Sequence, residues 1–185
     1  MTDAAGACAI AINYGRVTDR RLVRVTSILA ADTYCEKLQQ RLGVDRFSAS
    51  EQGLPPTNEI RDQVETLSLM DECRMWGGFD GRSLVVLTDE PVSFHPTNKT
   101  VNVVHVRSLN DAIRHVNVAT QTIGVYPAER KVALRDRLAS MGGQRAVRLG
   151  CASSVVLGGA HDAMLPLQRF VHWMSDEDAN GNQMY

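Results

Sequence analysis

The sequence lacks several features that would point directly to a function. Its 185 residues carry 20 basic and 21 acidic side chains, so no surplus of one sign would draw it to nucleic acid or to an anionic membrane. No apolar run approaches the ~20 residues needed to cross a bilayer, and the polar start Met1-Thr2-Asp3 differs from a signal peptide. We therefore expect a cytoplasmic protein with no nucleic-acid partner and no membrane span.

Cysteines are few and scattered. The four of them, Cys8, Cys35, Cys73 and Cys151, form no C-x-x-C pair, which argues against both a disulfide framework and a zinc site. The five histidines lack the H-E-x-x-H spacing of a zinc hydrolase, and no serine-centred nucleophile elbow is present. We expect no bound metal.

A glycine-rich dinucleotide fingerprint is also missing. No G-x-G-x-x-G segment links a predicted strand to a predicted helix, and Gly158-Gly159 alone cannot replace it. The chain by itself therefore does not encode the usual site for a dinucleotide cofactor.

What the sequence does contain is an alternation of short β-branched runs with segments of helical apolar spacing. The predicted strands are residues 9–15, 84–87, 100–106, 120–125 and 145–149. The predicted helices are residues 18–42, 58–76, 109–116 with Ser108 as its cap, 128–141, and 165–174 with Leu167, Phe170, Val171 and Met174 facing inward. The pattern predicts an α/β fold, a mainly parallel sheet flanked by helices, in one domain over residues 1–178 with a flexible tail over 179–185.

Three segments carry a family resemblance. Residues 121–125, Gln-Thr-Ile-Gly-Val, resemble the Q-T-V-G strand of LuxC-type fatty-acyl reductases, and residues 93–100 are similar to their S-P-L-N-R-T segment. Residues 161–167, His-Asp-Ala-Met-Leu-Pro-Leu, followed by Val171-His172-Trp173, resemble H-D-G-M-x-P-L and L-V-R-W. Residues 103–113 also resemble the strand and D-E-A-I helix of the wider aldehyde dehydrogenase superfamily. The resemblance implies the C-terminal catalytic half of such a reductase, with an aldehyde-dehydrogenase-like catalytic domain.

The same resemblance points to a nucleophile. Residues 7–11, Ala-Cys-Ala-Ile-Ala, resemble the family segment that holds the reactive cysteine, which makes Cys8 the candidate to hold an acyl group as a thioester. The alternative reading of Cys8 is a small apolar residue near a frayed terminus. Cys151 is the second candidate, because it follows a predicted strand. Cys35 and Cys73 lie in helical apolar stripes and are predicted to be core residues.

Other polar residues are candidates for binding. His95 and Asn98 lie on a predicted loop that, in the superfamily, approaches the nicotinamide ribose, which implies contact with cofactor or substrate; the alternative is that Asn98 and Pro96 shape a turn. His161 and Asp162 are candidates for the wall of the site, with Asp162 as a helix N-cap as the simpler explanation.

The resemblance implies an NADPH-dependent reductase of acyl thioesters, which converts a fatty acyl-CoA or a carrier-bound acyl group into an aldehyde. Its NADPH would be bound mainly by an N-terminal half missing from this chain or by a partner chain. The expected partners are a complementary nucleotide-binding chain or further copies in a homo-oligomer. Two residues depart from the family pattern, Ala163 in place of Gly and Ile12 in place of a common Arg. The alternatives are a non-catalytic assembly subunit and an acyl-transferring module without reduction.

Overall fold

The computed structural model describes residues 22–25, 28–43, 54–96 and 98–151, and beyond these only positions 156, 159–160, 164–165, 170–171 and 174. The predicted strand over residues 9–15 and the predicted tail over residues 179–185 lie outside the described residues. The chain divides into two units, residues 1–154 and residues 155–185.

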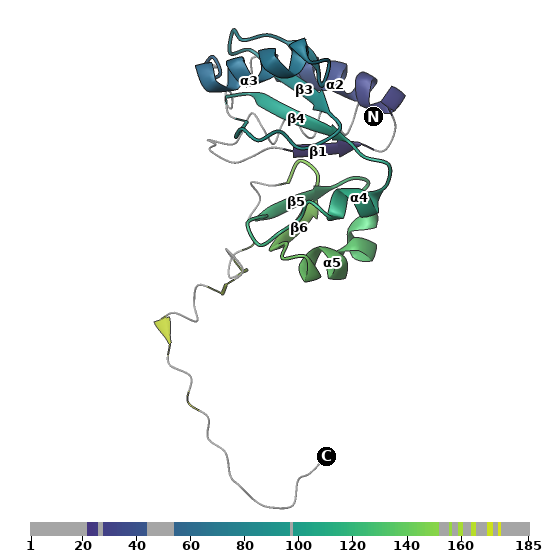
Figure 1. The fold of residues 1–185 in the computed structure, drawn as a ribbon. Coiled ribbons are helices and arrows are strands. Elements are labelled where there is room, and N and C mark those ends of the chain that lie inside the picture. The colour runs from purple at the N-terminus through teal and green to yellow at the C-terminus, as the bar shows by residue number, and fades with distance from the viewer. Residues whose placement is uncertain are drawn as a thin grey trace, which may run out of the picture. The chain divides into compact units, whose positions relative to one another are not determined.

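The larger of two sheets in the first unit has four strands in the order β1-β4-β3-β2. Figure 1 labels the first three of them, β1, β4 and β3. They are β1 (Leu22–Val25), β2 (Arg74–Gly77), β3 (Leu84–Thr88) and β4 (Thr100–His105). β4 pairs in parallel with both β1 and β3, whereas β2 pairs antiparallel with β3 at the edge. The predicted α/β class with a mainly parallel sheet is confirmed.

Helices cover both faces of this sheet, because its central strands are apolar on both sides. Helix α2 (Ile28–Leu42) packs through Leu38 and other buried residues against Val85 and Val103. Helix α3 (Asn58–Leu69) packs through Ile60 and Val64 on a second cluster that includes Val86. Alternate residues of β3 thus enter opposite clusters, as the twofold periodicity of a strand requires.

The smaller sheet is a β-α-β unit. Its parallel strands β5 (Thr122–Val125) and β6 (Arg145–Arg148) are joined by α5 (Arg130–Ser140). Helix α4 (Leu109–Ile113) begins at Ser108, whose Oγ accepts a hydrogen bond from the Asp111 N–H at 3.2 Å, so the predicted cap is confirmed. A buried cluster lies beside the smaller sheet and consists of Ile113, Val116, Val125 and Leu138.

Two predicted helices were too long. The segment predicted as a helix over residues 18–42 contains β1 before α2, and residues 18–21 of it lie outside the described residues. The segment predicted over residues 58–76 ends as a helix at Leu69 and continues as β2. In both places an apolar pattern compatible with a helix is overridden by pairing with a neighbouring strand, β4 for β1 and β3 for β2.

The end of α3 explains why β2 was missed. Asp71 adopts the left-handed conformation with φ 59°, the Glu72 N–H donates to the Leu67 carbonyl at 2.9 Å, and the Asp71 N–H donates to the Ser68 carbonyl at 3.2 Å. This hydrogen-bond pair ends a helix and normally uses glycine at the left-handed position. Helix α5 ends with the same pair of hydrogen bonds around Gly142, where a glycine does occupy the left-handed position.

The predicted helix over residues 165–174 is wrong at the positions that the structure describes. Leu165, Val171 and Met174 are not helical, Phe170 has 3-10 rather than α-helical conformation, and Phe170 and Met174 are 83% and 86% exposed. An apolar stripe stabilises a helix only where a partner surface buries it. No buried hydrophobic cluster includes any described residue of this second unit.

Asn102 fixes the connection between β3 and β4, residues 89–99, which we call the β3–β4 crossover. The fully buried Asn102 amide donates to the Val86 carbonyl at 3.1 Å and to Thr88 Oγ1 at 2.9 Å. Its Oδ1 accepts from the Val92 N–H at 3.2 Å, and Thr88 Oγ1 donates to the Glu90 carbonyl at 2.6 Å. One side chain in β4 therefore holds both the end of β3 and the first turn of the crossover.

We predict that Asn102→Ala lowers the free energy of unfolding by roughly 2–4 kcal/mol. The substitution removes the buried hydrogen bonds that the Asn102 side chain makes with the Val92 N–H and with the Val86 carbonyl. Urea unfolding followed by circular dichroism measures the loss. Asn58→Ala, at the exposed start of α3, is the control and should change stability by less than about 0.5 kcal/mol. Equal losses in the two variants would contradict a structural role for Asn102.

Gly77, the last residue of β2, and Gly78, which follows it, offer a second matched pair of variants. Gly77 has φ +90°, and a Cβ placed there would lie 2.1 Å from the Ser83 carbonyl oxygen, whereas a Cβ on Gly78 would meet nothing within 4 Å. We predict that Gly77→Ala destabilises the chain by at least about 2 kcal/mol and Gly78→Ala by less than about 1 kcal/mol. The midpoint of urea unfolding reports both values, and a tolerated Gly77→Ala would show that this turn rearranges freely.

Candidate functional site

The structure describes two of the five site residues predicted from the sequence. Cys8, His161 and Asp162 lie outside the described residues, and their predicted roles stay predictions. His95 and Asn98 both belong to the β3–β4 crossover. They do not share an environment.

Asn98 shapes the turn into β4. It has φ 50°, Lys99 has φ 58°, and the Asn98 amide donates to the Pro55 carbonyl at 3.3 Å. Lys99 Nζ donates to the Leu42 carbonyl at 3.5 Å, at the last residue of α2. Asparagine tolerates the left-handed conformation better than most residues. This tolerance and the hydrogen bond to Pro55 give a structural reason for asparagine at position 98. Contact of Asn98 with a cofactor stays a prediction.

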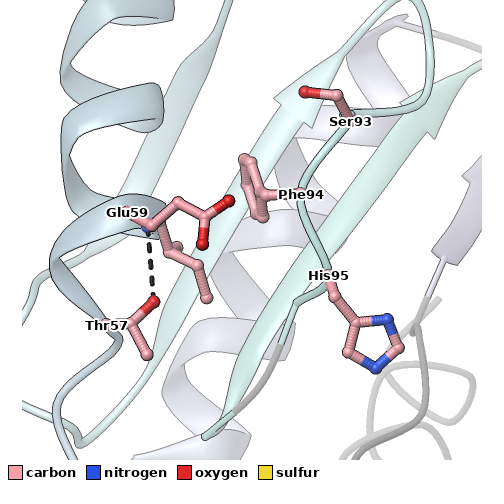
Figure 2. A pocket seen from close by; sticks show the side chains of 6 residues that line it. Thr57, Glu59, Ser93, Phe94 and His95 are labelled. Carbon is pink, nitrogen blue, oxygen red and sulfur yellow. Dashed lines mark hydrogen bonds between the residues drawn. The ribbon is translucent and has the colours of Figure 1, made fainter.

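His95 lines an open hollow of about 280 Å³ at the start of α3. Figure 2 shows the exposed His95 ring directed away from Glu59 and Phe94, with Ser93 on the same crossover and Thr57 on the helix side. The lining residues are Thr57, Glu59, Ile60, Ser93, Phe94 and His95. We call this the α3 hollow.

Polar side chains hold the rim of the α3 hollow. Ser93 Oγ donates to Gln63 Oε1 at 3.0 Å, and Gln63 Nε2 donates to Glu59 Oε1 at 3.5 Å, so the crossover is tied to the helix by side chains. Buried Phe94 forms the apolar part of the lining. The Glu59 carboxylate and the Thr57 and Ser93 hydroxyls can hydrogen-bond a small polar group in this hollow.

The parallel strands β1, β3 and β4 end at the same edge of the main sheet, which we call the carboxyl edge. A second group of polar residues lies there. Val25 of β1 is in register with His105 of β4, and Thr88 of β3 is in register with Val104. Ligands of open α/β sheets bind outside the carboxyl ends of the strands. Asn98 precedes β4 and therefore lies at the opposite edge.

His105 and Asp89 meet at the carboxyl edge. His105 Nδ1 lies 3.5 Å from Asp89 Oδ1, with the imidazole 24% exposed and the carboxylate 90% exposed. Sequence reasoning missed this pair, although a signal exists: polar residues directly follow one buried strand and end the next. Bringing them together required the strand order, in which β4 lies beside β3.

The described cysteines differ in their environments. Burial, reinforced by the Asp32 carboxylate and opposed by Arg74, raises the pKa of the fully buried Cys35 thiol to about 12 from 9.0. Burial also raises the pKa of the Cys73 thiol, which donates to the Val64 carbonyl at 3.8 Å. Both cysteines belong to the buried clusters, so the prediction that they are core residues is confirmed. Cys151 is half-buried just after β6.

The direction of the Cys35 shift has a consequence for stability. Folding favours the protonated thiol, so this residue leaves stability unaffected below pH 9 and reduces it as pH rises from 9.0 toward 12.

In the part of the chain that the structure describes, no three histidine, cysteine, aspartate or glutamate side chains come together in a way that could hold a metal ion. Within the same residues, no helix combines the length and the apolar character needed to span a bilayer.

Comparisons with known proteins give a family and several relatives. The model of the family described as acyl-CoA reductase (LuxC) matches residues 37–173. The long-chain acyl-protein thioester reductase of Vibrio harveyi is 31% identical over an alignment of 142 residues, and the match covers 72% of this chain and 30% of that protein. Those of Aliivibrio fischeri and Photorhabdus luminescens are 30% and 33% identical over 78% and 67% of this chain.

This chain spans less than a third of the length of these relatives, 30%, 31% and 28% respectively. Among solved structures, a protein described as a methylmalonate-semialdehyde dehydrogenase from Sinorhizobium meliloti, in complex with NAD, is similar to it with a TM-score of 0.47 and 17% identity. That similarity covers 79% of this chain and 36% of the other.

We predict a clear order of thiol reactivity in the folded chain. At pH 8 a thiol with a pKa of about 12 is ionised in roughly one molecule in ten thousand, so Cys35 should resist 5,5′-dithiobis(2-nitrobenzoic acid) until the chain unfolds. Half-buried Cys151 should react within minutes. Peptide mass mapping after timed labelling assigns each site, and equal labelling of Cys35 and Cys151 would contradict the predicted shielding.

Proposed function

Because the chain belongs to the acyl-CoA reductase (LuxC) family, whose model matches residues 37–173, we propose that it is the thiol-bearing half of an acyl-thioester reductase. That match is the observation that carries the proposal. The relatives are named long-chain acyl-protein thioester reductases, which supports a long-chain acyl group on a coenzyme A or carrier thiol as the substrate.

Cys8 is the proposed nucleophile. Its thiolate attacks the acyl carbonyl carbon, the bond from that carbon to the donor sulfur breaks, and the donor leaves as a thiolate that takes up a proton. Cys8 precedes the residues matched by the family model, so its assignment rests on the resemblance of residues 7–11 to the family segment. The burial of Cys35 and Cys73 supports it, because a shielded thiol with a raised pKa is a poor nucleophile.

The second half-reaction needs a hydride, which NADPH would supply to the acyl carbon so that an aldehyde leaves and the Cys8 thiolate re-forms. The described strand-to-helix turn between β5 and α5, residues 126–129, has no glycine that would let the backbone approach a pyrophosphate. We therefore assign cofactor binding mainly to a complementary half, as the small share of the relatives' length spanned by this chain suggests.

Four further residues keep proposed roles. His95 would contact a polar part of the cofactor or substrate from the α3 hollow, where hydroxyl and carboxylate groups accompany it. Asn98 would also contact the cofactor or substrate, from the turn that its hydrogen bond to the Pro55 carbonyl holds. His161 and Asp162 would form the wall of the site, inside the residues that the family model matches.

We predict that incubating the chain with a long-chain acyl-CoA adds one acyl mass. Cys8→Ser should abolish the addition, while Cys35→Ser and Cys73→Ser leave it intact, because those two thiols are buried. Intact-mass spectrometry counts the acyl groups, and hydroxylamine release at neutral pH identifies a thioester.

Three outcomes would change the assignment. Acylation of Cys151 would move the nucleophile to the end of β6. Absence of acylation, even when the complementary half is present, would favour a non-catalytic assembly subunit. Stable acylation without aldehyde formation in the reconstituted enzyme with NADPH would favour an acyl-transferring module.

A further inference from the structure

We propose that the β-α-β unit of the smaller sheet is the docking surface for the acyl donor, and that this donor is a carrier protein with an acidic face. The proposal rests on the proposed function, in which the acyl group arrives on a coenzyme A or carrier thiol, and it selects the carrier. Its basis is a group of three basic residues, which we call the basic cluster: Arg130 and Lys131 at the start of α5, and Arg148 at the end of β6.

Positive charge is concentrated in the β-α-β unit. Residues 122–148 contain six basic and two acidic side chains, whereas residues 54–106 contain four basic and eight acidic side chains. The whole chain has a formal net charge of −1, so the surplus is local. A local surplus of one sign attracts a partner of the opposite sign to that part of the surface.

The two acidic residues of this unit do not neutralise the basic cluster. Asp136 pairs with Arg135 at 3.1 Å. Glu129 precedes α5 and its side chain makes no capping hydrogen bond. Within the residues that the structure describes, no carboxylate forms an ion pair with a member of the basic cluster. The positive charge there is therefore available to a partner.

The fold brings the basic cluster together at one end of the unit. β5 and β6 are parallel, with Val125 in register with Arg148, so α5 begins at the end where β6 finishes. Ala146 packs toward Leu138 of α5, and Arg148, two residues later, lies on the same side of the strand. Lys131 lies seven residues before Leu138 and thus on the same side of α5.

Two members of the basic cluster occupy positions that are unfavourable for the helix itself. The N-terminus of a helix carries a partial positive charge, so its first turn favours aspartate and glutamate. Helices α3 and α4 have Glu59 and Asp111 there, whereas α5 has no acidic residue in its first turn and begins with Arg130 and Lys131. Residues that reduce local stability without a structural benefit are typical of functional surfaces.

An exposed apolar residue next to the basic cluster favours a protein as the partner. Val132 is 66% exposed, and arginine beside an exposed apolar side chain is typical of protein interfaces. Guanidinium groups also bind carboxylates through paired hydrogen bonds. A helix that lies on a membrane needs a face of large apolar residues, and in α5, all of which the structure describes, Val132 is the only such exposed residue.

The first experiment measures binding of a bacterial holo-acyl carrier protein, chosen for its net negative charge, to the full chain by calorimetry. We expect the affinity to fall at least about tenfold between about 50 mM and about 300 mM NaCl. The variant Arg130→Glu/Arg148→Glu should weaken binding at least about 20-fold. The control Arg41→Glu/Arg82→Glu changes the net charge equally at two exposed residues outside the unit and should weaken binding less than about 3-fold.

Loss of binding can be separated from loss of folding. Arg130→Glu places an acidic side chain in the first turn of α5, so Arg130→Glu/Arg148→Glu should unfold at the same or a higher urea concentration than the wild type. Absence of carrier binding by the wild type, or equal weakening by the two double variants, would overturn the proposal. Binding of the wild type to vesicles of phosphatidylglycerol that the same variant abolishes would overturn it in favour of a membrane surface.

A second experiment separates this proposal from the proposed function by comparing acylation of the chain by a palmitoyl carrier protein and by palmitoyl-CoA. We expect Arg130→Glu/Arg148→Glu to slow transfer from the carrier at least about tenfold more than transfer from palmitoyl-CoA. Equal slowing with both donors would overturn carrier docking. If neither donor acylates the wild type but the holo-carrier binds as expected, the proposed function fails and the docking surface stands.

Discussion

The buried Asn102 amide is the interaction on which the arrangement of the main sheet depends. Its hydrogen bonds join β4 to the end of β3 and to the Val92 N–H of the crossover. A polar group buried in this way stabilises a fold only when its partners are all present, and then it specifies one geometry. Here that geometry has two consequences. Asp89 is held beside the end of β4, and Val92 and Phe94 are brought onto the α3 side of the sheet.

The parts of the fold that were predictable are those whose signals are local. The Ser108 cap is read directly from neighbouring residues, and α4 and α5 were predicted close to their observed positions. The end of α3 could not be read in this way, because Asp71 takes a conformation usually left to glycine. Strands β1 and β2 were missed because only their pairing with β4 and β3 distinguishes them from helix. Asn102 gave no signal, since its partners follow from the register of two strands.

In the candidate site, too, local sequence motifs predicted one part, and only the strand order revealed the other. His95 was found from a motif, and the structure places it in a hollow with Glu59 and Ser93, whereas Asn98 holds a turn at the other end of the crossover. The pairing of His105 with Asp89 depends on β4 lying beside β3, and a sequence without that order shows only two separate polar residues. Motifs therefore identified the family and one lining residue, and topology identified the pair at the carboxyl edge.

The β3–β4 crossover also constrains how this family can diverge. Most parallel neighbours are joined through a helix, yet residues 89–99 connect β3 to β4 without one and are fastened at both ends, by Asn102 and by the Asn98 turn. Surface loops ordinarily absorb insertions at little cost. An insertion here would have to displace Val92 and Phe94 from a buried cluster. We therefore expect length differences among homologous chains to lie outside residues 89–99. The crossover would then be a segment of constant length against which distant members can be aligned.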